Sequence, residues 1–441
     1  MNSVESSRSL PVAAALMLLL ITGTPPAMAA TGEEFSLDLE ELEKKDYEVG
    51  GFAEVSWEHL AIRDDGAYTF LNSGQTPTSS LDRHTGTLQL QGAYTKGITR
   101  LNALAQAVSR KDDLESSDSI NLFEGNLSIA PSSWFSTTLG KKAYTWGKGY
   151  AWNPVGFINR MKDPNNPDDS LEGYVTTEVE VIKSFAGNLQ NLALNTVLLP
   201  VDGDLNDDFG EDDHVNLAAK LYLLLFDTDI DFIAYTGNSR TSRYGLDFSR
   251  NITTNFEIHG ETSYITNLER TVLQTDGGKI QDVENAASYL AGIRHLTSWD
   301  LTSIIEYYHN GGGYSENEMD VFFNAVDAAS EQRNVTGFET GLDALQRLGN
   351  QGYSRPYLGR NYLYAKFSQK EPFDILYFTP ALTAIINLDD GSSTVTPELN
   401  YTGFTNWEVK LRFALLSGPQ NSEYGEKQNG NKIELNIRYF F

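Results

Sequence analysis

Apolar and polar side chains alternate at every second position in many segments of the chain, and the last nine residues show this pattern clearly. One face of this C-terminal segment carries Ile433, Leu435, Ile437, Tyr439 and Phe441. The other face carries Glu434, Asn436 and Arg438. A period of two is typical of a β-strand with an apolar environment on one side and water on the other. The pattern therefore predicts an amphipathic strand at the C-terminus.

Similar segments recur between residues 47 and 441, and there are about eighteen of them (roughly 16 to 18) when clusters of Gly, Asn, Asp, Ser and Pro are taken as connections. The longer connections cover residues 63–84, 111–118, 145–173, 201–214, 267–282, 310–356 and 417–429. Short turns on one side and long loops on the other predict an all-β fold, a transmembrane, antiparallel, up-and-down β-barrel with short periplasmic turns and long outer loops. A water-soluble barrel or sandwich with its apolar face inward is the alternative.

One long connection contains a helical pattern, within residues 310–356. Apolar side chains recur there at helical spacing, at Met319, Phe322, Phe323, Val326 and Ala329. Because an apolar stripe in a loop must be buried, we expect this helix to pack on the barrel mouth or to fold inward.

The N-terminal residues carry the parts of a secretory signal. Arg8 precedes an apolar run over residues 10–21, and small residues follow up to Ala30. We expect a signal peptide at residues 1–29, a periplasmic segment at residues 30–46 and the barrel at residues 47–441. No later apolar run reaches the length of about 18 residues that a spanning helix needs.

The C-terminal strand, which ends in Tyr439 and Phe441, resembles the closing strand of bacterial outer-membrane barrels of the porin-like kind. The resemblance covers the last nine residues and agrees with a secretory signal. It implies that Tyr439 and Phe441 form the assembly signal and that the protein is integral to the cell outer membrane after signal-peptide cleavage. It also implies outer-membrane lipid and the barrel-assembly machinery as partners, and leaves a homo-oligomer open.

The composition and the absence of known motifs argue against several classes of function. The formal net charge of -27 argues against a nucleic-acid partner, because a polyanion would be repelled. The absence of cysteine excludes disulfides, thiol catalysis and Cys-based metal sites. The six histidines are scattered and no hydrolase or phosphate-loop motif is present, so we expect no enzyme activity, no catalytic residue and no cofactor. The acidic residues 202–213 lack the turn glycine and final Glu of a calcium loop, so we expect a solvated loop and no metal site.

The connection over residues 145–173 combines glycines, prolines, aromatic side chains and charges of both signs. In position and length it resembles the loop that bends into the lumen of porins and narrows it. Glycine permits close approach to the wall, and proline and aromatic side chains stiffen the path. A loop packed over the rim is the alternative. The expected pore and constriction residues are Trp146, Lys148, Tyr150, Trp152, Arg160, Lys162, Asp163, Asp168 and Asp169.

A barrel of about eighteen strands is wide enough for a water-filled lumen. Charges between lipid-facing positions should line this lumen, because a charge facing hydrocarbon costs about 2–4 kcal/mol. The expected lumen-wall residues are Arg100, Glu178, Glu180, Glu257, Glu261, Arg360, Lys366, Lys410, Arg412 and Arg438. The basic members come mainly from late strands and the acidic members from middle strands, which predicts a transverse field; scattered charges are the alternative.

These patterns favour an outer-membrane, porin-like channel through which small hydrophilic solutes or ions diffuse. Two other functions stay open at this point. One is a barrel that holds a partner such as a cytochrome, and the other is an outer-membrane hydrolase.

Overall fold

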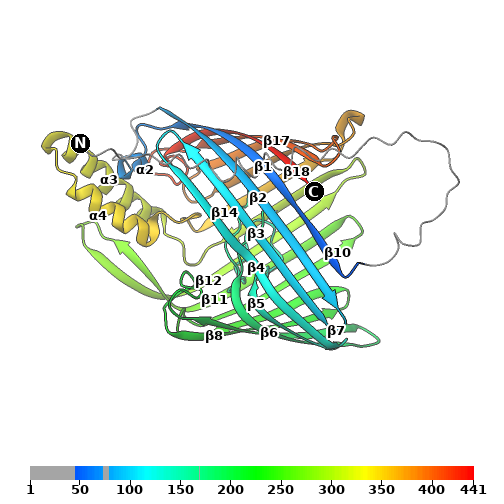
Figure 1. Cartoon of the computed structure of the whole chain (residues 1–441). Coiled ribbons are helices and arrows are strands. Elements are labelled where there is room, and N and C mark those ends of the chain that lie inside the picture. The colour runs from blue at the N-terminus through cyan, green and yellow to red at the C-terminus, as the bar shows by residue number, and fades with distance from the viewer. Residues whose placement is uncertain (1–44, 73–78, 168) are drawn as a thin grey trace, which may run out of the picture.

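The computed structural model describes residues 45–72, 79–167 and 169–441. They form an 18-stranded antiparallel sheet in which consecutive strands pair, and β1 pairs with both β2 and β18, so the sheet closes into a barrel (Figure 1). The strands are β1 (Tyr47–Ile62), β2 (Ser80–Lys96), β3 (Thr99–Asp112), β4 (Ser116–Ser132), β5 (Phe135–Lys142), β6 (Tyr174–Ser184), β7 (Leu189–Val201), β8 (His214–Leu225), β9 (Thr228–Thr236), β10 (Arg243–Thr253), β11 (Phe256–Leu273), β12 (Lys279–Leu296), β13 (Leu301–His309), β14 (Asn361–Gln369), β15 (Phe378–Asn387), β16 (Ser393–Tyr401), β17 (Trp407–Ser417) and β18 (Asn429–Phe440). The predicted fold is confirmed.

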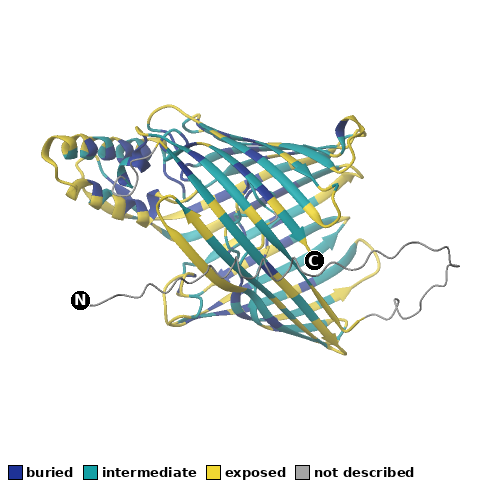
Figure 2. Cartoon of the chain, turned by 45° about the horizontal axis from the view of Figure 1, so that its top comes forward, coloured by how far each residue is buried: buried dark blue, intermediate teal, exposed yellow. Residues whose placement is uncertain are grey.

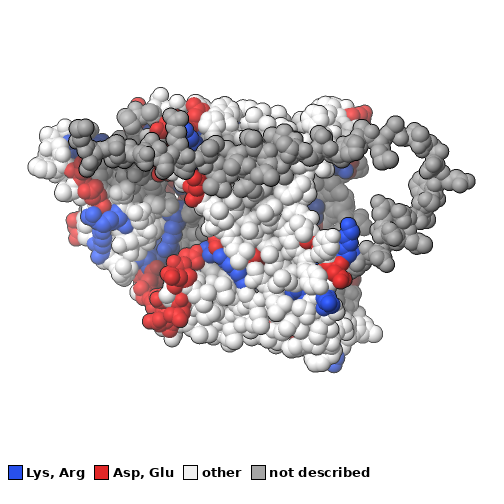
Figure 3. Space-filling view, in the orientation of Figure 1, with Lys and Arg blue, Asp and Glu red and all other residues white. Residues whose placement is uncertain are grey.

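Side chains alternate across the barrel wall as the sequence pattern requires. On β7, Leu194 and Leu198 are each 44% exposed on the outer surface, whereas Val197 is fully buried on the inner face. On the face shown in Figure 3, broad areas of the wall carry no charged side chain, and the largest group of acidic side chains lies toward the end of the barrel that carries the helices. The exposed apolar surface is therefore the outside of the barrel, and polar side chains face the lumen.

Two expected loops are mostly strand. Residues 111–118 reduce to a turn of residues 113–115, and residues 267–282 reduce to residues 274–278. The strands β11 and β12 each contain 18 residues, so their hairpin projects past its shorter neighbours β10 and β13. Polar residues such as Glu269 and Asp282 resemble loop residues in a sequence, yet both stay paired in the ladder of this hairpin.

Helices cover one end of the barrel, which we call the loop end; the opposite end, with the short connections, is the turn end (Figure 1). The helices are α2 (Ala67–Leu71), α3 (Glu316–Thr336) and α4 (Thr340–Leu348), with a π-helical turn η2 (Gly349–Tyr353) after α4 and a short 3-10 turn η3 (Pro372–Asp374) at the turn end. No helix among the described residues is both long enough and apolar enough to cross a membrane.

The expected helix in residues 310–356 is confirmed as α3. Ser315 and Glu318 form a reciprocal capping box at its start, and Gly337, with φ 74°, ends it. Its apolar stripe is buried against α2, α4 and η2, with Phe322 and Phe323 fully enclosed (Figure 2). The stripe therefore packs on the barrel mouth and does not enter the lumen.

The expected signal peptide, residues 1–29, lies outside the described residues, as do residues 30–44 of the expected periplasmic segment and Asp168. The first strand begins at Tyr47.

Candidate functional site

The connection between β5 and β6, residues 143–173, lies inside the barrel, and we call it the lumen loop. Its first part is held by apolar packing, because Trp146, Val155 and Phe157 are buried together with wall residues of β7, β8 and β9. Gly245 on β10 lies under this segment, where an added Cβ would be 2.9 Å from a Val155 methyl carbon. The absence of a side chain at Gly245 thus leaves room for the loop.

Two wall carboxylates hold the backbone of the lumen loop. Glu261 on β11 accepts hydrogen bonds from the N–H groups of Lys148 and Gly149, both at 2.6 Å, and from the Asn153 amide at 2.9 Å. Glu306 on β13 accepts from the N–H groups of Tyr150 at 2.5 Å and Ala151 at 2.8 Å. Hydrogen bonds to a charged acceptor are among the stronger ones in proteins, so these two side chains fix the loop against one side of the wall.

A buried ion pair adds to this attachment. The Lys148 ammonium lies 3.0 Å from an Asp231 oxygen on β9 and 3.9 Å from an Asp247 oxygen on β10. Asp231 and Asp247 are directly opposite each other in the sheet and are almost fully buried. The lysine therefore supplies the positive charge that two adjacent buried carboxylates require.

The far part of the lumen loop reaches the opposite wall. The Arg412 guanidinium on β17 donates to the Asn166 side chain at 2.7 Å, and Thr396 on β16 donates to Asn165 at 3.4 Å. The loop leaves β5 and β6, passes β9 to β13 and touches β16 and β17, so it crosses the lumen.

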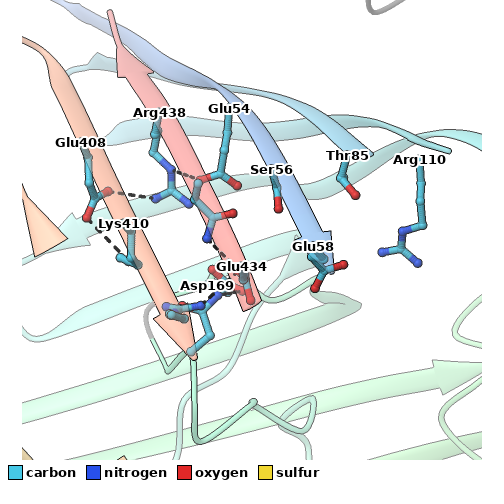
Figure 4. Close-up of a pocket in the computed structure, with 13 residues that line it drawn as sticks. Glu54, Ser56, Glu58, Thr85, Arg110, Asp169, Glu408, Lys410, Glu434 and Arg438 are labelled. Atoms are coloured by element: carbon cyan, nitrogen blue, oxygen red, sulfur yellow. Dashed lines mark hydrogen bonds and ion pairs between the residues drawn. The ribbon is translucent and has the colours of Figure 1, made fainter. Parts of the chain in front are cut away.

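A gap of about 180 Å³ lies between Asp169 of the loop and the wall of β17, β18, β1, β2 and β3 (Figure 4). Figure 4 shows charged side chains of both signs turned toward this gap. The lining residues with charges are Glu54, Glu58, Arg110, Asp169, Glu408, Lys410, Arg412, Glu434 and Arg438. We call this space the wall gap.

Basic groups of the wall gap are paired with neighbouring carboxylates. Arg438 lies 2.8 Å from Glu54, and Lys410 lies 3.6 Å from Glu408. Arg412 lies 2.6 Å from Glu398 and 3.5 Å from Glu434. Because Arg438, Lys410 and Arg412 are each offset by a nearby carboxylate, the late strands carry a mixed rather than a purely basic surface, and a transverse field would be weaker than segregated charges would give.

Further expected lumen-wall residues lie on β6, on β14 and at the two ends of the barrel. Glu178 on β6 pairs with Lys142, and Glu180 accepts from Ser136 at 3.2 Å. Lys366 on β14 falls on the inward face that also carries Tyr362 and Tyr364, and Arg100 lines a cavity of about 380 Å³ at the turn end. Arg360 lies just before β14 in the connection of residues 310–360, 3.8 Å from Glu318, and therefore at the loop end rather than on a strand.

The remaining expected loop residues take several roles. The Tyr150 hydroxyl donates to Glu257 at 3.3 Å, and the Trp152 ring stacks on Tyr308 at 5.1 Å between centroids. The Lys162 ammonium donates to the Gly149 carbonyl at 2.7 Å. Arg160 pairs with Asp208, and Asp163 accepts from the Asn165 N–H at 2.9 Å.

The sequence analysis did not single out Glu306, Asp231 or Asp247. Each is an acidic residue on an inward face and in a strand rich in apolar or aromatic residues, as in Leu301–His309 around Glu306. An isolated carboxylate in such a strand needs a partner when buried, and this is the signal that could have found them.

The acidic connection after β7 brings together Asp202, Asp212 and Asp213, whose nearest oxygens lie within 4.8 Å of one another. All three side chains are exposed, and Asp212 accepts a hydrogen bond from the Gly203 N–H at 2.9 Å. Exposed carboxylates linked to their own loop backbone are typical of a solvated loop.

The closed 18-strand barrel, with an apolar outer surface and a connection inserted into its lumen, has the architecture of a porin-like barrel. Among solved structures, the chain is similar to a variant of Rhodopseudomonas blastica porin at 10% identity and a TM-score of 0.43, and to a triple variant of that porin at 10% identity and a TM-score of 0.44. Both alignments cover 90% of this chain and 100% of the porin. No family model and no curated protein matches the chain.

Proposed function

We propose that the protein is an outer-membrane, porin-like channel for the diffusion of small hydrophilic solutes or ions. The observation that carries the proposal is a closed barrel whose lumen is crossed, and narrowed, by residues 143–173. A loop fixed to the wall by charged hydrogen bonds can define an aperture, because its position does not depend on a solute.

The proposed route runs past the lumen loop. A recess of about 580 Å³ lies on the loop-end side, the wall gap lies beside Asp169, and the cavity of Arg100 lies toward the turn end. All three contain charged or polar side chains, which favours hydrated solutes over apolar ones.

The proposal includes an orientation and a location. The helices and long connections would face the cell exterior, and the turn end with both termini of the barrel would face the periplasm. Residues 1–29 would serve as the export signal, Tyr439 and Phe441 would be read by the assembly machinery, and lipid would contact the exposed apolar wall.

The test is single-channel recording of the purified, folded barrel in planar bilayers. We expect stepwise conductance, and we expect liposomes that contain the barrel to swell in small sugars, amino acids or anions. Heat-unfolded protein from the same preparation is the control. A folded barrel that passes neither ions nor sugars would contradict the proposal.

The geometry gives less support to the two other functions. The lumen loop occupies space in which an enclosed protein partner would lie, which disfavours a sheath for a cytochrome. His259 and Glu306 lie 2.9 Å apart, as a hydrolase could use, but both Glu306 oxygens accept hydrogen bonds from the loop backbone. Retention of a haem protein through purification, with no channel current, would favour the sheath instead.

A further inference from the structure

The recess on the loop-end side lies between the lumen loop, the inner faces of β10 to β13 and the segment before β14. Its walls include Trp152 and Lys162 from the lumen loop, Arg243 from β10, Ser263 from β11 and Arg355 from the segment before β14. A volume of about 580 Å³ falls within the range of small-molecule sites, which is roughly 300–1,000 Å³.

Positive charge dominates the lining of this recess, although the whole chain is strongly acidic. The basic lining residues are Arg160, Lys162, Arg240, Arg243, Arg270 and Arg355, and the acidic ones are Asp208 and Glu269. Asp208 is paired with Arg160, and Arg270 is offset by Asp282 and Glu284 outside the recess.

Four of these cations lack a carboxylate partner. Within the described part of the chain, no carboxylate oxygen lies in ion-pair distance of Lys162, Arg240, Arg243 or Arg355. Arg240 instead lies over the Phe209 ring at 3.9 Å and donates to the Phe209 carbonyl. Among the described residues, the Arg240 guanidinium therefore forms no ion pair with a carboxylate.

The recess also contains buried donors without acceptors. Among the described residues, Trp152 Nε1, Arg243 Nε and Ser263 Oγ are buried and make no hydrogen bond. The Trp152 side chain is more than nine-tenths buried. A buried donor without an acceptor is unfavourable, so a ligand that brings acceptors recovers free energy at each of these atoms.

Burial also destabilises the positive charges of the recess, which favours the binding of an anion. Burial lowers the pKa of Lys162 and of Arg240, both of which lie in connections outside the strands. A depressed pKa means that the surroundings do not fully stabilise the positive charge. An anion placed between these groups would supply what the protein lacks.

We propose that this recess is a binding site for small organic oxyanions, carboxylates or phosphate esters, held by Arg243, Arg240 and Lys162. The inference deepens the proposed channel function, on which it rests, by naming the class of solute that the loop-end side selects. The arginine and lysine side chains donate hydrogen bonds to the charged oxygens of the anion. Trp152 and Ser263 donate to its remaining oxygens.

The test is isothermal titration calorimetry of the folded, full-length barrel in detergent. The probes share one ring and differ in the attached group: benzoate, phenyl phosphate and uncharged benzyl alcohol. We expect at least one anion to bind and benzyl alcohol to bind much more weakly, and the preferred anion distinguishes a carboxylate from a phosphate ester. Equal binding of benzyl alcohol would overturn the proposal.

Variants locate the site. Arg243→Gln should weaken anion binding by roughly tenfold, because one charged hydrogen-bond donor is lost. Arg250→Gln changes the same residue type on the same strand at the turn end, outside the recess, and should leave binding unchanged.

Lys162→Gln tests the opposite wall of the recess if Arg243→Gln does not fold. Equal affinity in the recess variant and in Arg250→Gln would overturn the assignment. Binding is measured at equilibrium, so a barrel that binds anions but carries no current would contradict the channel alone.

Discussion

At the residue scale, the carboxylates of the inner wall determine where the lumen loop lies. Glu261 accepts two backbone hydrogen bonds at 2.6 Å and one from an asparagine side chain at 2.9 Å. One charged side chain thus satisfies several backbone groups that would otherwise be buried without partners. Neutralising Glu261 should therefore increase the mobility of the lumen loop while the barrel stays folded.

Glu261→Gln should loosen the lumen loop, because hydrogen bonds to a charged acceptor contribute about 1.5–3 kcal/mol each. We expect a larger and noisier single-channel conductance and faster tryptic cleavage after Lys148, Arg160 or Lys162 in the folded barrel. Glu180→Gln is the matched control, since Glu180 also faces the lumen but, among the described residues, accepts a hydrogen bond only from Ser136. Identical cleavage rates in the two variants would refute the anchoring role.

The lowered pKa of Lys162 gives a prediction about pH. Burial favours the neutral amine, so this lysine loses its proton at a lower pH than an exposed lysine. Its contribution to anion binding is present below that pKa and is lost as pH rises through it. Benzoate affinity should therefore fall at alkaline pH in the native protein and fall less in Lys162→Arg, because a guanidinium stays charged. Calorimetry across the pH range checks this; parallel curves would argue against it.

Sequence reasoning found the residues of the lumen loop but not their partners. Lys148 could be identified as a charge near a constriction, whereas its neighbours Asp231 and Asp247 belong to strands far along the chain. Which carboxylate meets which loop atom depends on the register and curvature of the closed barrel, and alternation along one strand does not contain that information.

At the element scale, the helices form a small apolar core at the loop end together with Val272 and Leu273 of β11. Phe322 of α3 is fully buried and stacks on Tyr353 of η2 at 4.3 Å, and Tyr68 of α2 packs on Phe323. Sequence spacing predicted α3, because its apolar stripe is a local feature. The helix α4 is short, with only Leu342 and Leu348 buried, and local pattern was insufficient to predict it.

Phe322→Ala should destabilise this helical core by about 3–5 kcal/mol, the usual cost of removing a buried phenylalanine ring. Because the strands do not depend on it, the barrel should stay folded while residues 310–360 become more open to proteolysis. Phe338→Ala is the control, since Phe338 is 71% exposed. Unchanged proteolysis of Phe322→Ala relative to Phe338→Ala would contradict the packing described.

At the scale of the whole molecule, the same added charge should lower the stability of the barrel by very different amounts at two adjacent positions of one strand. Leu194→Arg places a charge on the outer surface of β7, and in lipid this should cost about 2–4 kcal/mol. Asn195→Arg places it in the lumen, where Asn195 already donates to Glu178 at 2.9 Å, and should cost little. Urea unfolding in lipid vesicles measures both; equal losses would mean that the apolar face does not contact lipid.

The barrel itself was predictable because its main constraint is repeated along the whole chain. Alternation in segments such as β17 and β18 predicts which face forms the outer wall, and loop lengths predict which end carries the long connections. The lengths of β3, β4, β11 and β12 were not predictable, because their ends are rich in polar residues that resemble loop residues in the sequence.

The anchors of the lumen loop also constrain the order of folding. Residues 143–173 precede β6, whereas Glu261, Glu306 and Arg412 belong to β11, β13 and β17. Until β11, β13 and β17 have joined the sheet, the loop lacks the acceptors Glu261 and Glu306 and the donor Arg412. Docking of this segment is thus a late event, which completes the aperture only when the sheet is nearly whole.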